Sequence, residues 1–288
     1  MDPGPLRDVL TVLVGVATGA LSGLFGVGGA VISTPGIRVL GASALVAVGT
    51  TLPSIIPGAA SGTARYVREQ LIDWRVVSLT APVGIIAAVG GSLLSKVVPG
   101  DGHLLMLLTA GLLGFSAWRM YVTGRAANES EDLEVSRAVA EADTEMAPHP
   151  APSPSRLTDA GGRGGAGPLR FAAVGAVAGL LSGLLGVGGG IVMVPGFTQV
   201  AKVPIKPAIA TSLACVALFA VPGTITHALL GDIDWRFAIL LAVGVIPGAR
   251  FGAGLAVRTG DRRLRAVVAG FLGLTAVLYA GGELLALA

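Results

Sequence analysis

The chain has 288 residues, of which 53% are hydrophobic and 13% are charged, with a mean hydropathy of +0.79. Soluble domains carry about 25% charged residues, so this composition excludes an ordinary soluble protein. The formal net charge of +3 comes from basic residues spread over loops, which excludes a nucleic-acid-binding surface. A single cysteine excludes an intramolecular disulfide and a cysteine-based metal site, and we expect no cofactor.

Apolar stretches almost free of charge follow one another along the chain, and several reach the roughly 20 residues that span about 30 Å of hydrocarbon. They cover residues 9–37, 39–64, 76–95, 104–118, 171–201, 208–231, 237–249 and 266–282. The sequence therefore predicts an all-α, polytopic protein that contacts the lipid of a bacterial or archaeal cytoplasmic membrane. The N-terminus lacks a basic region and a small-residue cleavage site, so we expect no removable signal peptide.

The first half begins with a glycine-rich apolar helix that leads into LSGLFGVGGAVISTPG, residues 21–36. The segment after GVGG is interrupted by Pro35 and is about 12 residues long, too short to span a membrane alone. It is either the returning arm of a re-entrant hairpin or a continuation of the first helix after a break. A helix is expected to begin near Thr50, followed by an Asp-Trp-Arg turn at residues 73–75 and two further helices.

Residues 124–169 interrupt the apolar pattern. They are first acidic and then rich in Pro, Ser and Gly, so they cannot bury enough apolar surface to offset the entropy of ordering. We expect a flexible linker that joins a transmembrane repeat at residues 1–123 to a second at 170–288.

The second half repeats the first. LSGLLGVGGGIVMVPG occupies residues 181–196, a helix is expected from near Thr211, and Asp-Trp-Arg returns at residues 234–236. This is an internal duplication. In membrane proteins, Gly- and Pro-interrupted segments in matching positions of two halves indicate a transport site.

Loop charges predict the orientation. If each half crosses an odd number of times with the N-terminus outside, most loop Lys and Arg lie on the cytoplasmic side with the linker, as the positive-inside rule requires. An even number of crossings would make the halves favour opposite orientations. We therefore expect two repeats of inverted topology, each with about four or five helical segments and with broken or re-entrant helices at the midplane.

The glycine turns are the candidate site. Glycines let backbone N–H groups face a ligand, and a helix that starts just after the turn directs its positive end at the same place, which suits an anion. The alternative is close helix packing through small residues. Matched hydroxyls stand before the turns and near the starts of the next helices, where they either donate to an anion or bond to backbone. The candidate residues are Gly28, Gly29, Gly188, Gly189, Ser22, Ser182, Thr50, Thr51, Thr211 and Ser212.

Arg250 is the remaining candidate, because it lies in an otherwise uncharged helix and would add positive potential. The alternative is an arginine that extends to the lipid headgroups. His227 could titrate near neutral pH, but no partner is evident in the sequence, and Cys215 is more simply a small packing residue. No nucleotide-binding loop, metal-ligand cluster or catalytic triad is present, so we do not expect an enzyme.

The motifs resemble those of the sulfite exporter TauE/SafE family, also called the four-toluene-sulfonate uptake permease family. The resemblance rests on the repeated G-x-x-S-G-x-x-G-x-G-G, on Thr211-Ser212-Leu213, on GDIDWR at residues 231–236 and on PGARFG around Arg250. It implies a bacterial or archaeal permease for small sulfur-containing anions such as sulfite, sulfoacetate and sulfonates. The first half departs from the pattern with GTTLP at residues 49–53 and AAVGGS at 87–92.

The leading hypothesis is a secondary transporter that exports sulfite or an organosulfonate. An inside-negative membrane expels an anion by about 2.3 kcal/mol per charge per 100 mV, so export needs no coupling ion. The alternatives are an importer of sulfonate, sulfate or thiosulfate and a channel-like anion-conducting protein. A homodimer is a further possibility that the sequence leaves open.

Overall fold

The computed structural model describes residues 4–94, 107–108, 110–122, 124, 167–186 and 188–287. The expected linker at 124–169 lies almost entirely outside these residues. In the described part all regular structure is helical, and six helices are long and apolar enough to cross a membrane, which confirms the all-α polytopic fold. The six are α1 (Pro5–Phe25), α4 (Trp74–Leu94), α7 (Pro168–Leu185), α9 (Ile205–Leu229), α10 (Trp235–Arg258) and α11 (Asp261–Leu287).

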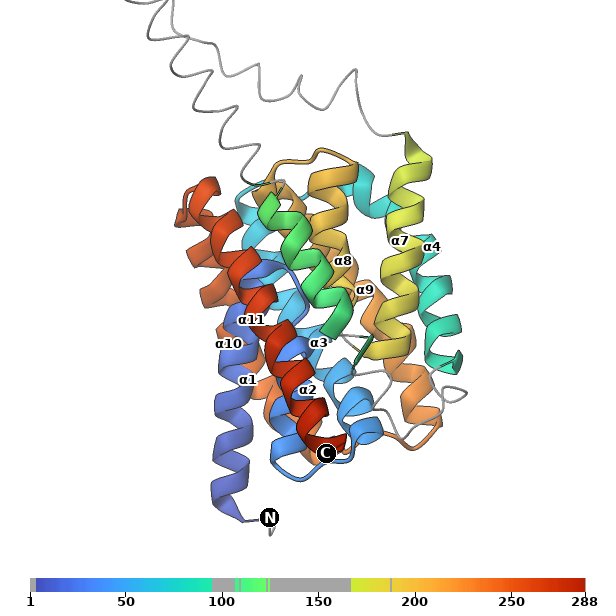
Figure 1. Cartoon of the computed structure of the whole chain (residues 1–288), viewed down its shortest axis with the longest axis vertical. Coiled ribbons are helices and arrows are strands. Elements are labelled where there is room, and N and C mark those ends of the chain that lie inside the picture. Colours follow the sequence, from blue (N-terminus) through green and yellow to red (C-terminus); the bar gives the residue numbers. More distant parts are fainter. Residues whose placement is uncertain are drawn as a thin grey trace, which may run out of the picture.

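The two halves interleave. Helix α1 packs along α10, and α4 packs along α7 in the same parallel sense, while α3 (Ala44–Arg68) lies against α9 and α10. Glycines allow the close approach: a Cβ at Gly19 of α1 would press on the carbonyl oxygen of Val245, and one at Gly183 of α7 on that of Ala88. Helices α1 and α7 begin at opposite ends of the molecule (Figure 1).

Each glycine turn is followed by a short helix that folds back along the helix before it. For α2 (Ala30–Val39), a Cβ at Gly29 would lie 2.7 Å from Cγ2 of Thr18, and a Cβ at Gly36 would lie 2.7 Å from Cγ1 of Val14. The contacts move backward along α1 as the chain moves forward, so the pair is a helical hairpin. This decides between the two arrangements that the sequence left open.

The second half contains the same hairpin. A Cβ at Gly189 would lie 2.5 Å from the carbonyl oxygen of Ala178, and one at Gly196 would lie 2.9 Å from Val174 Cγ1. The returning arm is α8 (Gly190–Pro195), continued by the π-helix η1 (Gly196–Val200). A single π-type turn after Pro195 fits a helix whose hydrogen-bond ladder the proline has interrupted.

The expected helix starts near Thr50 and Thr211 are wrong. Helix α3 begins at Ala44, where the Ser43 hydroxyl accepts a hydrogen bond from the N–H of Val46, and α9 begins at Ile205. Both threonines therefore lie in the second turn of their helices. The Asp-Trp-Arg turns cap the helices that follow them, since the carboxylate of Asp234 accepts from two N–H groups of the first turn of α10, and Asp73 does the same for α4.

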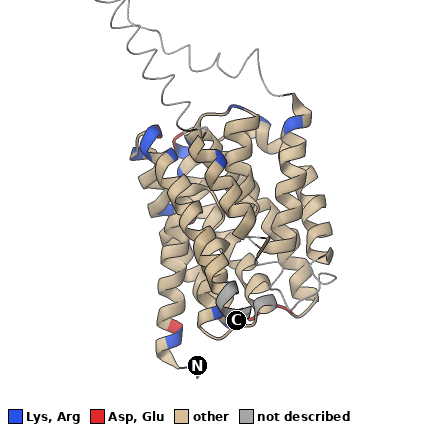
Figure 2. Cartoon of the chain, viewed as in Figure 1, with Lys and Arg blue, Asp and Glu red and all other residues tan. Residues whose placement is uncertain are grey.

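The ends and flanks of the bundle differ in chemistry. Figure 2 shows Lys and Arg gathered mainly at the end where α7 begins, with few along the flanks. The flanks expose apolar side chains, as on α10, where Ile239, Val243 and Phe251 face outward. Trp74 and Trp235, at the starts of α4 and α10, are also exposed, as expected of residues at a membrane–water interface.

Candidate functional site

The glycine turns are built on positive backbone φ angles. Helix α1 ends at Gly26 (φ 69°), whose N–H donates to the carbonyl oxygen of Ser22 at 2.8 Å, and Gly29 (φ 80°) precedes α2. Gly186 (φ 65°) and Gly189 (φ 70°) take the same positions in the second half. Residues other than glycine are disfavoured in this region, so the repeated glycines follow from the reversal of the chain.

The two turns touch each other at the middle of the bundle. A Cβ at Gly188 would lie 3.6 Å from Cα of Gly28, 3.5 Å from Ile55 Cδ1 and 3.2 Å from Val216 Cγ1. Ile55 and Val216 lie near the midpoints of α3 and α9. The duplication predicted that the two turns would meet, and the structure places them together between these central helices.

Unused hydrogen-bond donors accompany the first turn. The buried N–H groups of Ala30 and Val31, at the start of α2, form no hydrogen bond among the described residues. The Ser22 side chain is 2% exposed and lines a cavity of about 10 Å³ together with Gly29 and Phe271. This volume accommodates about one water molecule, so the site is closed to a larger anion in this conformation.

The second turn has a matching serine. Ser182 is 1% exposed, its Cβ lies 3.3 Å from the position of a Cβ on Gly189, and its hydroxyl has no hydrogen-bond partner in the part of the chain that the structure describes. Buried hydroxyls are normally satisfied, and one without a partner calls for an explanation such as water or a ligand. Ser182 is therefore the strongest side-chain candidate, and the buried Ser22 stands at the matching position beside the first turn.

Four other predicted hydroxyls are already used. Thr50 Oγ1 accepts from the N–H of Asp234 at 2.9 Å, and Thr211 Oγ1 accepts from the N–H of Asp73 at 3.1 Å. Each bond joins the second turn of one helix to the residue before a helix of the other half. The remaining two bond to backbone: Ser212 donates to the carbonyl oxygen of Gly26 at 2.9 Å, and Thr51 donates to that of Val48 at 3.0 Å. Ser212 thereby braces the first turn.

The structure does not bring Arg250 to the turns. Its side chain is exposed on α10, beside the outward-facing Phe251. The end of α10 at Arg258 lies about 12 Å further along the helix axis, at 1.5 Å per residue. An arginine that extends toward the headgroups accounts for this position better than one that contacts the anion.

Two further polar residues form a pair that the sequence did not reveal. His227 is fully buried, and its Nδ1 lies 3.4 Å from Oδ2 of Asp232 in the loop before α10. The first half has Tyr66 and Leu71 at the corresponding places. The only sequence feature that could have indicated the pair is therefore that Asp232 replaces a leucine of the other repeat. Cys215 is buried and unpaired, as a packing residue would be.

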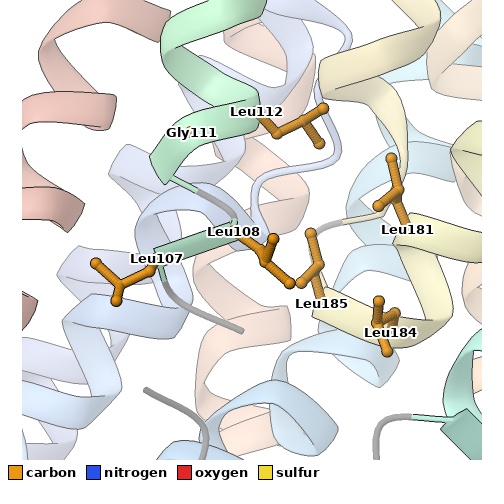
Figure 3. Close-up of a pocket in the computed structure, with 7 residues that line it drawn as sticks. All are labelled: Leu107, Leu108, Gly111, Leu112, Leu181, Leu184 and Leu185. Atoms are coloured by element: carbon orange, nitrogen blue, oxygen red, sulfur yellow. The ribbon is translucent and has the colours of Figure 1, made fainter. Parts of the chain in front are cut away.

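A larger cavity lies beside the second hairpin. It measures about 440 Å³, and the described residues that line it are leucines and one glycine, four of them between residues 107 and 112 and three on α7 (Figure 3). The lining residues are Leu107, Leu108, Gly111, Leu112, Leu181, Leu184 and Leu185. Among the described residues that line the cavity, none has a polar side chain.

The family described as sulfite exporter TauE/SafE matches residues 11–279, from the first helix to the last. The chain belongs to the TauE/SafE family. The match includes both hairpins, so the paired glycine turns belong to the part of the chain that TauE/SafE proteins share.

Relatives of this TauE/SafE chain are membrane transporters by name. A probable membrane transporter protein of Xylella fastidiosa is 27% identical over 274 residues, 94% of each chain. YunE of Bacillus subtilis, also a probable membrane transporter protein, is 25% identical over 86% of this chain and 88% of its own. MamO of Paramagnetospirillum magneticum is 29% identical over 86% of this chain but 40% of MamO. No solved structure matches the chain significantly.

Proposed function

We propose that this membrane transporter exports a small sulfur-containing anion such as sulfite or an organosulfonate, and that the anion binds between the two glycine turns. The observation that carries the proposal is the pair of buried serines, Ser22 and Ser182, placed symmetrically beside turns that touch each other. The family description supports the substrate class.

The chemistry of the turns suits an oxoanion. Its oxygens accept hydrogen bonds, and the turns offer donors in the N–H groups of Gly28, Gly29, Gly188 and Gly189 and in the serine hydroxyls. The start of α2 adds the positive end of a helix dipole, which favours negative charge without a buried cation. The apolar surroundings strengthen each of these interactions.

Transport requires the turns to separate, because the cavity beside Ser22 holds about one water. Halves of inverted topology would allow this by rocking against each other around the turns. The end rich in Lys and Arg would be cytoplasmic, with the linker there and both termini outside (Figure 2). The inside-negative potential would then drive the anion outward.

Transport by purified protein in vesicles tests the proposal. Radiolabelled sulfite, sulfoacetate, taurine, thiosulfate and sulfate are each offered under an imposed membrane potential of either sign. Saturable flux of sulfite or a sulfonate toward the positive side, with counterflow when unlabelled anion is loaded on the opposite side, is expected. Flux that requires a proton or sodium gradient and runs inward would establish an importer, and flux without saturation or counterflow would establish a channel. Absence of flux for all five anions would overturn the proposed substrate class.

A further inference from the structure

Two matching hydrogen bonds join the halves at opposite ends of the bundle. At one end, Thr50 of α3 accepts from the N–H of Asp234, the residue before α10. At the other, Thr211 of α9 accepts from the N–H of Asp73, the residue before α4. In each case the third helix of one half is bonded to the start of the fourth helix of the other.

The two contacts lie toward opposite ends of the bundle. Helices α3 and α9 run antiparallel, since Gly62 packs near Leu213 and Gly223 near Leu52. Thr50 and Thr211 each lie six residues, about 9 Å, past the start of their own helix. The Thr50 end is the end of the N-terminus, because Arg236, in the first turn of α10, pairs with Asp8 of α1 at 2.7 Å.

The contact between the two turns, at Gly28 and Gly188, lies between Thr211 and Thr50, beside Val216 of α9 and Ile55 of α3. Helices α3 and α9 flank this contact, and the fourth helices, α10 and α4, pack on them. At the Thr50 end the closure is tight, since a Cβ on Gly49 would lie 3.1 Å from Cβ of Asp232. With both hydrogen bonds formed, the cavity at Ser22 accommodates about one water molecule.

We propose that Thr50–Asp234 and Thr211–Asp73 are the two gates of the transport cycle, one for each face of the membrane. This rests on the proposed transport function but on no particular substrate. A neutral hydrogen bond contributes modestly, so one such bond can open and close reversibly while the glycine-mediated packing of α1 on α10 and α4 on α7 persists. Thr50 and Thr211 are thus positioning residues that set which face is open.

The proposal predicts opposite effects from matched substitutions. Thr50→Val and Thr211→Val keep the branched shape and remove the acceptor oxygen. A Cys215→Ser, Ala30→Cys background carries a single thiol at the buried turn, and a membrane-impermeant maleimide is applied to right-side-out or inside-out vesicles without substrate. Thr50→Val should raise labelling about threefold to tenfold from the face of the N-terminus, and Thr211→Val from the opposite face, the range expected from losing one hydrogen bond.

Three controls separate gating from loss of structure. Thr50→Ser and Thr211→Ser keep the oxygen and should label as the parent does. Thr226→Val removes a hydroxyl that bonds within its own helix, to Pro222, and should leave the sidedness unchanged. The double variant Thr50→Val/Thr211→Val should label faster from both faces.

Equal effects of the two single variants on both faces, or no effect in protein that unfolds at the parent temperature, would overturn the gate assignment. Because no substrate is present, sided labelling together with failed sulfite transport would retain the gates and reject only the substrate.

Discussion

Phe25 of α1 and Phe271 of α11 place their ring centroids 4.5 Å apart, next to the cavity that Ser22 lines. The helix at residues 110–122 packs on α11 through two contacts, Gly114 near Ala276 and Gly273 near Ala117. Gly114 corresponds to Gly273 in the repeat and Ala117 to Ala276, so exchanging the two halves turns each contact into the other. The same exchange places Leu185 and Leu112 beside the second hairpin where Phe25 and Phe271 stand beside the first.

The two hairpins are therefore closed differently. The aromatic pair leaves about 10 Å³ beside the first hairpin, and the leucines Leu112 and Leu185 border the cavity of about 440 Å³ beside the second. Tyr279 adds to the first closure, because its hydroxyl donates to the carbonyl oxygen of Val31 in α2 at 2.9 Å. The two halves fold in the same way. They differ in packing, because α11 closes tightly on the first hairpin and the helix at residues 110–122 closes less tightly on the second.

Phe271→Ala should destabilise the protein because it removes the partner of Phe25, and by less than the roughly 3–5 kcal/mol of a fully buried phenylalanine, because Phe271 is only partly buried. Thermal unfolding in detergent would record this as a lower midpoint. Phe115→Ala is the matched control, since Phe115 is 59% exposed and should change the midpoint little. Equal midpoints for both variants would mean that Phe271 does not hold α11 in place.

Gly189→Ala and Gly29→Ala should destabilise the hairpins more than positive φ alone requires. The new Cβ would meet Ala178 or Thr18 as well as forcing an L-residue into the left-handed region, which costs about 1–2 kcal/mol. Gly231→Ala isolates the backbone term, because Gly231 has φ 75° and open space at the Cβ position. Thermal unfolding compares the three, and a Gly231 variant as unstable as the others would argue against tight packing at the turns.

Ser182→Ala should leave the unfolding midpoint without ligand nearly unchanged, because the hydroxyl has no partner among the described residues. Sulfite affinity should fall by roughly 10-fold to 100-fold, the effect of losing a hydrogen bond of about 1.5–3 kcal/mol to a charged ligand. Isothermal titration calorimetry measures the change. Ser78→Ala is the control, since Ser78 is exposed and bonds to Arg75 in its own helix. Unchanged sulfite affinity in the Ser182 variant would place the anion elsewhere.

Arg250→Ala should bind sulfite within about twofold of the parent, because the Arg250 side chain is exposed on the outer face of α10, away from the turns. Arg250→Lys should behave the same way. The same calorimetric titration decides: strong loss in Arg250→Ala with recovery in Arg250→Lys would show that the charge acts on the ligand.

The duplication carried most of what the sequence could predict. Repeated glycines with a following proline indicated two broken helices that meet, because few other residues tolerate the φ angles at Gly29 and Gly189. The sequence misplaces the starts of α3 and α9 because the hydroxyls of Thr50 and Thr211 resemble helix caps, although they bond to the other half. Their partners lie 184 and 138 residues away, and no local pattern reveals such a bond.

Glycine also limited the prediction of the site. The sequence does not distinguish a glycine that exposes N–H groups to a ligand from one that lets two helices pack closely. Gly29 is an example, because it packs directly on α1. The serines can be told apart only in the fold. Ser182 is buried without a hydrogen-bond partner among the described residues, whereas Ser212 donates to the carbonyl oxygen of Gly26. The sequence does not predict the contact between Asp232 and His227, because this contact depends on the path of the loop before α10.

The interleaving of the halves has a consequence for biogenesis. During synthesis α1 and α4 enter the membrane long before α10 and α7 exist, so the first half must wait in lipid with its glycine faces uncovered. Two fragments cut within residues 124–169 would each lack the helices that cover these faces. We therefore expect neither fragment to accumulate alone in cells and both to be rescued by coexpression, so that the assembled bundle behaves as an obligate complex of its own two halves.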